Sequence, residues 1–295
     1  MAGKGRALRG RIRSVQNTRK ITRTMELVAT SKLKRAQDRV VSARPYAESL
    51  RAVIADLVTP ELAAEFPLLR KPAPPSKGGP TAAAVILVTS NRGLAGAFNS
   101  NLIKEARRRI EELERMGYSV ELHTVGKKGA GFFKYLGRPL AADRQDVGDR
   151  PTAEHAASIV EPLLAAYAAG RLASVDMVYA GFQSALSTPP TIAMVLPVEP
   201  PADRKAGRRP DYILRPSPGA ILEQLLPLYV RNMVYRGLVE TAAGEQGARR
   251  TAMKNATDNA GEIIDYLKRT YNRQRQAAIT QEISEIVGGA AALQG

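Results

Sequence analysis

Two stretches of the chain, one near each end, repeat apolar residues at the spacing of a paired helix. From Leu33 to Leu57 apolar side chains recur at alternating steps of three and four residues, which is the spacing of a coiled-coil stripe. Closer to the N-terminus the same periodicity is looser, and it runs through Leu8, Ile12, Val15, Ile21, Met25 and Val28. Pro45 lies inside the later stretch. It is expected to bend or locally break the helix, because proline removes a backbone donor.

The C-terminal stretch repeats this pattern through Met253, Ala256, Ala260, Ile263 and Leu267. It then turns polar, and apolar residues resume at Ile279. No proline follows Pro227, so a helix of about 60 residues and about 90 Å is allowed. Two such helices could pair in antiparallel fashion, with the middle of the chain inserted at one end. Alternatively, each could pack separately into a helical domain.

The middle of the chain alternates short buried-type strands with helices, behind a Pro/Gly-rich linker at residues 71–80. This alternation predicts an α/β domain whose sheet is covered by helices. The sequence therefore divides into a helix at 1–57, a central domain at 58–219 that ends in a Pro-rich loop at 197–218, and a helix at 220–295. The predicted strands are 83–89, 120–125, 175–180 and 192–198, and the predicted helices are 102–116, 130–136 and 152–169.

The composition excludes several kinds of chemistry. The 295 residues contain no Cys and two His, which excludes disulfides and a cysteine nucleophile and argues against a multi-histidine metal site. No apolar run approaches the length of a membrane span, and the N-terminus lacks the apolar core of a signal peptide. We expect a soluble, intracellular chain.

The net charge of +16 is concentrated near the N-terminus, where residues 1–57 hold 14 Lys and Arg against 4 Asp and Glu. Such an arm fits nucleic acid, an acidic protein surface or a solvated helix face. The first 45 residues contain no aromatic side chain on which bases could stack. The three interpretations remain open on pattern alone. The basic cluster consists of Arg6, Arg9, Arg11, Arg13, Arg19, Lys20 and Arg23.

The turn TSNRGLAGAFN, at Thr89–Asn99, follows the first predicted strand and opens a helix, as a phosphate-binding loop would. It has neither GxGxxG spacing nor a terminal GK[ST], so a tight turn with close packing is favoured over nucleotide binding. His123 and His155 have no nucleophile or carboxylate at a motif spacing. Glu111, Glu112 and Glu114 interleave with arginines, as on a solvated helix. The sequence predicts no catalytic residue, no metal site and no cofactor.

Three blocks of this sequence closely resemble the F-type ATP synthase gamma subunit family. They are RIRSVQNTRKITRTMELVATSKLKRAQ, SNRGLAGAFN and RTAMKNATDNAGEII with YNRQRQAAITQEISEIVGGAAAL. The resemblance implies an antiparallel two-helix coiled coil formed by the terminal segments and a central Rossmann-like α/β domain. It implies a non-catalytic rotor shaft that couples ion-driven rotation of a membrane c-subunit ring to ATP synthesis or hydrolysis on the beta subunits.

The resemblance also implies partners and contact residues. The partners would be three alpha and three beta subunits, an epsilon subunit and the c ring, with no specific nucleic acid and with membrane contact only through partners. The residues that match contacts with alpha and beta are Arg11, Arg19, Lys20, Arg23, Met25, Arg249, Arg275, Gln276, Thr280 and Glu282. Those expected at the foot on the c ring are Lys32, Lys34, Tyr212, Leu214 and Arg215.

One position departs from the family pattern. Bacterial relatives often read YEP where this chain has Leu214, Arg215 and Pro216, so a carboxylate contact with the ring is not expected at Arg215. The absence of Cys excludes the thiol switch of chloroplast relatives, and the chain starts where the family starts. We therefore expect a bacterial protein on the cytoplasmic face of the plasma membrane, held there by its partners.

Overall fold

The computed structural model describes residues 2–72, 74–75, 78–199 and 217–293. The described chain forms two compact units. Unit 1 contains residues 1–29 and 249–295, and unit 2 contains residues 30–248. Two long helices, α1 (Ala2–Leu57) and α6 (Pro218–Leu293), contribute to both units. The long terminal helices and the central α/β sheet confirm the predicted fold class.

Unit 2 is built on a five-stranded sheet in the order β3-β2-β1-β4-β5. Strands β1 (Ala82–Val88), β2 (Ser119–Val125), β3 (Ala142–Arg144) and β4 (Leu172–Ala180) are parallel, and β5 (Pro190–Leu196) is antiparallel to β4. The four strands expected from the sequence are confirmed. The three-residue β3 was not predicted, because so short a segment carries no periodicity.

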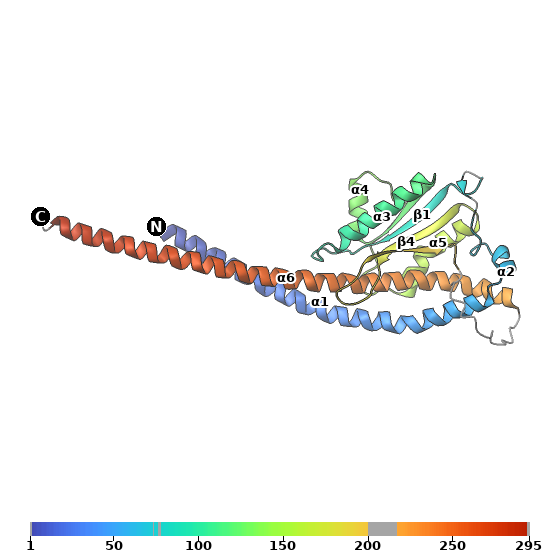
Figure 1. The fold of residues 1–295 in the computed structure, drawn as a ribbon, viewed down its shortest axis with the longest axis horizontal. Helices are drawn as coiled ribbons and strands as arrows, with labels where there is room; N and C mark the ends of the chain where they lie inside the picture. Colours follow the sequence, from blue (N-terminus) through green and yellow to red (C-terminus); the bar gives the residue numbers. More distant parts are fainter. Residues whose placement is uncertain (1, 73, 76–77, 200–216, 294–295) are drawn as a thin grey trace. The chain divides into compact units, whose positions relative to one another are not determined.

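Helices cover both faces of this sheet (Figure 1). On one face, Ala83, Val85 and Leu87 pack against α3 (Phe98–Arg115) and α4 (Lys127–Tyr135). On the other face, Ala84 and Ile86 share a core with α5 (Ala153–Ala168), the first turns of α6 and the end of α1. Alternate residues of β1 therefore supply two separate cores, which explains its continuous apolar run. A short helix, α2 (Pro60–Glu65), follows α1 and is capped by the Thr59 side chain.

In unit 2 the predicted stripe from Leu33 to Leu57 is the buried face of α1. Leu33, Ala36, Val40, Leu50, Ile54 and Leu57 are all buried. Ala36 and Val40 pack against Val239 and Ala243 of α6. Pro45 lies within α1 without ending the helix, so the expected local break is wrong.

In unit 1 the N-terminal part of α1 pairs in antiparallel fashion with the part of α6 that runs from Met253 to Tyr271. Arg9 lies over the ring of Tyr271, while further along α1 the Thr22 hydroxyl meets that of Thr257. As the residue number rises on α1, that of the partner on α6 falls. This confirms the antiparallel pairing of the two termini over separate helical domains.

We call the buried contact between the two helices of unit 1 the seam. At several points the residue buried in the seam lies one position along the chain from the residue that the sequence predicted. The buried residues of unit 1 are Thr22, Ala29, Arg249, Met253, Thr257, Ala260 and Ile264. Ile21, Val28 and Ile263 were expected inside, but they are 60%, 51% and 48% exposed. The contact thus combines Met253 and Ile264 with small residues and a pair of bonded hydroxyl groups, in which Thr257 donates to Thr22.

Candidate functional site: the helix pair and the turn after β1

The basic residues predicted to contact partners lie on exposed positions of α1 in unit 1. Arg11, Arg19, Lys20 and Arg23 are exposed, and Met25 is half-buried. The Arg23 guanidinium pairs with Glu26 at 3.0 Å, and the Arg19 guanidinium lies against Gly261 of α6. The cluster is therefore a solvent-facing surface, in a form that an acidic partner could reach.

The predicted contact residues of α6 divide into two kinds. Arg275, Gln276, Thr280 and Glu282 are exposed on the last turns of α6. Arg249 is only 8% exposed, so most of its surface is already covered by this chain. The four exposed residues have their polar atoms available to a partner, whereas Arg249 has only a small remaining surface for one.

Large apolar side chains of unit 1 face outward. They lie on both helices, at positions next to the buried seam. Their exposed fractions are 60% for Ile21, 59% for Leu27, 51% for Val28, 48% for Ile263 and 62% for Tyr266. These side chains are available to a neighbouring subunit, because unit 1 itself leaves about half or more of each uncovered.

The residues predicted for the foot are only partly described. Lys34 is exposed and pairs with Asp38 at 2.9 Å. Lys32 is half-buried and pairs with Asp149 of the loop after β3. Tyr212, Leu214 and Arg215 lie outside the described residues, as does the Arg-rich stretch 200–210. Lys32 thus has a structural partner within unit 2, in addition to any external role.

The glycine-rich turn after β1 serves as a cap for α4. The first backbone N–H groups of this helix donate to the turn: Lys127 to Asn91 Oδ1 at 2.9 Å, Lys128 to the Ser90 carbonyl at 3.1 Å, and Gly129 to Thr89 Oγ1 at 2.9 Å. These are the groups that would bind a phosphate at a helix N-terminus. The chain's own oxygens therefore occupy the N-terminus of α4. At α3, the helix that the turn itself opens, the N-cap residue Ala97 makes no side-chain cap bond, so the tight-turn interpretation stays a prediction for that helix.

A cavity of about 620 Å³ lies beside this turn, at the carboxyl edge of the parallel strands. Such an edge is where open α/β sheets bind ligands. Its wall carries Arg92, Lys127 and Arg150, which are balanced by Asp146, Asp149 and Glu245. The cavity therefore has no excess of positive charge and no free helix N-terminus that would favour a nucleotide.

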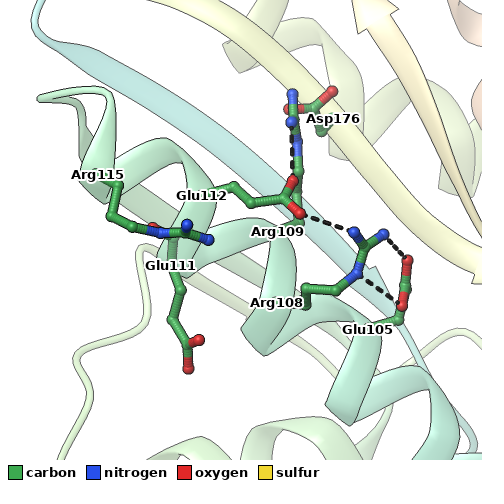
Figure 2. A network of polar contacts seen from close by, with 7 residues as sticks. All are labelled: Glu105, Arg108, Arg109, Glu111, Glu112, Arg115 and Asp176. Carbon is green, nitrogen blue, oxygen red and sulfur yellow. Dashed lines mark hydrogen bonds and ion pairs between the residues drawn. The ribbon is translucent and has the colours of Figure 1, made fainter.

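The remaining candidates for chemistry have structural roles. His155 forms a reciprocal cap with Thr152 at the start of α5, and burial lowers the pKa of His123 in β2. Figure 2 shows that the carboxylates of α3 alternate with arginines, and that Arg109 reaches Asp176 of β4. Among the described residues, no group of His, Asp and Glu side chains could hold a metal ion.

Sequence reasoning missed a segment of α6 that is buried on all sides, Gly237–Gly247. It contains the buried polar residues Glu240, Thr241, Glu245 and Gln246. Apolar repeats predict an amphipathic helix, and they do not mark a helical segment in which many of the buried residues are small or polar. The signal that could have found the segment is the spacing of Gly237, Gly244 and Gly247 in GLVETAAGEQG.

Comparison with known proteins agrees with this architecture. The "ATP synthase" family model matches residues 4–293. The ATP synthase gamma chain of Gemmatimonas aurantiaca is 61% identical over 293 residues, covering 99% of each chain. The chain belongs to the ATP synthase gamma chain family. A second gamma chain, from Frankia casuarinae, is 42% identical and also covers 99% of each chain.

Solved structures share the gamma chain's fold. A chain of the Euglena gracilis mitochondrial ATP synthase superposes with a TM-score of 0.71 at 20% identity, covering 99% of this chain and 95% of that one. A chain of the Tetrahymena thermophila mitochondrial ATP synthase central stalk and c ring gives 0.60 at 22% identity, covering 80% of this chain and 99% of that one. The family match over residues 4–293 and the 61% identity to a curated gamma chain make this chain a subunit of an ATP synthase. No helix among the described residues is long and apolar enough to cross a membrane.

Proposed function

We propose that this gamma chain is the central rotor shaft of its ATP synthase. It couples rotation of a membrane ring of c subunits, driven by protons or sodium ions, to ATP synthesis or hydrolysis on the beta subunits. It carries no catalytic group of its own. The support for this last point is that, at the carboxyl edge of its sheet, the first N–H groups of α4 are capped by the chain's own oxygens.

One observation carries the proposal: at several neighbouring positions unit 1 buries the small or hydroxyl residue and leaves a large apolar residue exposed. Thr22 and Thr257 are buried while Ile21 and Ile263 are exposed. A helix pair with an apolar outer surface is suited to enclosure by other subunits. Most of these exposed side chains are aliphatic, with Tyr266 as an aromatic exception, so such a surface can turn in a sleeve without binding tightly at one angle.

The proposed partners are those that membership of the family implies, and charge and exposure support them. Three alpha and three beta subunits would enclose unit 1, with acidic loops of beta facing the exposed Arg11, Arg19, Lys20 and Arg23. Charge attraction at this surface is long-range and weakly directional, so it tolerates sliding. Met25 and the small exposed surface of Arg249 would take part in the same contact. An epsilon subunit would bind unit 2, and the c ring would contact Lys32, Lys34, Tyr212, Leu214 and Arg215.

The last turns of α6 are proposed to latch onto the catalytic ring. Arg275, Gln276, Thr280 and Glu282 are exposed there, so their hydrogen bonds would be made to alpha and beta. The complex would lie on the cytoplasmic face of the bacterial plasma membrane, with the gamma chain reaching the membrane only through the ring. The division into a helix at 1–57, a domain at 58–219 and a helix at 220–295 remains a prediction from the sequence.

The test is magnesium-ATP hydrolysis by the alpha and beta subunits of the same organism, with and without this chain. We expect one chain per hexamer, higher turnover with it, and no hydrolysis by the chain alone. If folded alpha and beta subunits fail to assemble with the chain, the shaft proposal is wrong. In that case the salt dependence of nucleic-acid binding becomes the next measurement.

The latch is tested by replacing Arg275 and Gln276 together with alanine. We expect the assembled complex to hydrolyse ATP more slowly, while the chain keeps its helix content by circular dichroism. The matched control is the same pair of substitutions two residues earlier, at Arg273 and Gln274, which are also exposed. Equal turnover in the two double variants would contradict the latch assignment.

A further inference from the structure

The buried segment of α6 is surrounded by four parts of unit 2. On one side, Gly244 lies against Ala180 of β4 and Phe98 of α3, where an added Cβ would come within 3.2 Å of each. On another, Gly247 faces the carbonyl of Ala185, at 2.9 Å from an added Cβ. We define the α6 collar as the parts that surround Gly237–Gly247: the end of β4 with the loop to Pro189, α3, the loop after β3, and α1.

Two side chains of α6 bond to the backbone of the collar. The Thr241 hydroxyl accepts from the backbone N–H of Ala180 at 3.2 Å, and Glu240 Oε2 accepts from that of Phe182 at 3.0 Å. The other oxygen of Glu240 pairs with Arg236 at 2.6 Å. Glu240 and Thr241 are each 3% exposed, so both bonds are shielded from water. A side chain of the helix thus completes the hydrogen bonding at the carboxyl end of β4.

Asp149 closes the collar on the side of α1. Its carboxylate pairs with Lys32 and accepts from Gln246 Nε2 at 3.4 Å, while its carbonyl accepts from Arg39 at 3.0 Å. One residue of the loop after β3 therefore bonds to both long helices. Lys32 and Asp149 are about one-third exposed as side chains, so this contact is weaker than the buried bonds of Glu240 and Thr241.

The hydrogen bonds of Glu240 and Thr241 are directional, whereas the apolar packing of α6 is not. The rest of α6 in unit 2 packs through Leu222, Leu226, Val230 and Val234, and apolar burial is non-directional. Hydrogen bonds to fixed backbone groups are directional, so they set the rotation of the helix about its own axis. We propose that Glu240 and Thr241 are positioning residues that lock α6 in rotation against the α/β part of unit 2, so that the two turn as one body. This inference deepens the proposed shaft function and rests on it for its role in torque.

The first test measures the lock in the full-length chain alone. Because the chain has no Cys, spin labels can be placed uniquely at Tyr135→Cys of α4 and Leu228→Cys of α6, which are 89% and 39% exposed. We expect the double variant Glu240→Met with Thr241→Val, which removes both accepting oxygens, to broaden the distance distribution between the labels by a factor of about two, since each lost bond raises the open fraction several-fold. The control is Glu223→Met with Thr251→Val, which changes exposed residues of the same helix.

Two further variants separate positioning from folding. Thr241→Ser keeps the accepting oxygen and should restore the narrow distribution, while Thr241→Val alone should broaden it less than the double variant. If the double variant does not fold, the comparison of these two single variants decides. A narrow distribution in every folded variant would overturn the proposal, as would equal broadening in the control.

The second test measures rotation in the assembled complex. A probe at Tyr135→Cys lies on α4 and reports rotation of the α/β part of unit 2, which reaches α6 only through the collar. A probe at Leu228→Cys lies on α6 and reports rotation of that helix directly. In the double variant we expect the angular variance at the Tyr135 probe to increase about twofold and that at the Leu228 probe to stay unchanged. If the wild-type complex assembles but does not rotate, the shaft proposal fails, and the distance measurement still decides the lock. Equal variance at both probes would refute the lock alone.

Discussion

The buried ion pair between α3 and β4 should respond unequally to removal of its two partners. Asp176 is 1% exposed, and Arg109 Nε and Nη2 each lie 3.0 Å from its Oδ2 (Figure 2). The Arg109 side chain is 18% exposed and also pairs with Glu112 at 3.3 Å. Among the described residues, Arg109 is the one ion-pair partner of Asp176. Removing the arginine therefore leaves a buried charge unpaired, whereas removing the aspartate does not.

The magnitudes follow from this difference. Arg109→Met should lower the free energy of unfolding by about 3–5 kcal/mol, the cost of leaving one partner of a buried pair uncompensated. Asp176→Leu should cost about 1–3 kcal/mol, because Arg109 keeps Glu112 and some contact with water. The double variant should lie closer to the wild type than Arg109→Met does, since replacing both partners removes the uncompensated charge as well as the attraction.

The pH dependence gives an independent check. Burial raises the pKa of Asp176, and Arg109 partly offsets this increase. Because the native state then holds the proton more tightly than the unfolded state, ionisation of Asp176 lowers stability as pH rises from its ordinary pKa through the raised one. Without Arg109 the native pKa rises further. The loss of unfolding free energy caused by Arg109→Met should therefore be smaller at about pH 5 than at about pH 8.

The assay is urea denaturation of the full chain, followed by circular dichroism at both pH values. Arg107→Met is the matched control, because Arg107 is exposed and its nearest carboxylate, on Glu111, lies 3.6 Å away. Its effect should stay within about 0.5 kcal/mol. If Asp176→Leu costs as much as Arg109→Met, or if the deficit of Arg109→Met does not change with pH, the reasoning about the unpaired carboxylate is refuted.

Three further perturbations test other parts of the structure. Gly126→Ala should lower the melting temperature sharply, because Gly126 has a φ of 99° and an added Cβ would lie 2.2 Å from the Thr89 carbonyl oxygen; an unchanged melting curve would contradict this. Thr257→Val should cost about 0.5–1.5 kcal/mol in urea denaturation, since it removes the hydrogen bond that Thr257 donates to the buried Thr22 hydroxyl, while Thr22 keeps the Arg19 carbonyl as its own acceptor. Calorimetric titration of the lone chain with ATP should give no binding heat, because the N–H groups at the start of α4 are occupied by the turn.

The sequence predicted the architecture because its patterns are long and regular. The continuous apolar run of β1 and the stripe of α1 from Leu33 to Leu57 each satisfy one period over many residues. Unit 2 buries both as predicted. A helix pair without other partners is most stable when its large apolar side chains lie between the two helices. The prediction assumed this rule for both units.

That assumption failed in unit 1, where neighbouring positions compete. Ile21 precedes Thr22 and Val28 precedes Ala29, and in each pair the smaller residue is buried. Hydrophobicity alone favours the isoleucine and the valine. The choice depends on how closely two backbones approach and on whether a hydroxyl finds a partner, and both require the second helix to be in place. The buried segment Gly237–Gly247 was missed for the same reason. Burial of Glu240 is tolerated only because Phe182 donates a hydrogen bond to its carboxylate and Arg236 pairs with it.

The two units thus follow opposite rules within the same pair of helices. In unit 2, α6 is surrounded, and directional bonds from Glu240 and Thr241 add to its apolar packing. In unit 1, small residues such as Thr22 and Ala29 form part of the contact between the helices, while Leu27, Ile263 and Tyr266 are exposed. A rotor that transmits torque needs a firm joint where it is carried and a yielding surface where it slides past its neighbours. On this interpretation, polar residues inside the collar and apolar residues outside the helix pair meet two requirements of one function, and a local rule of hydrophobic burial cannot distinguish them.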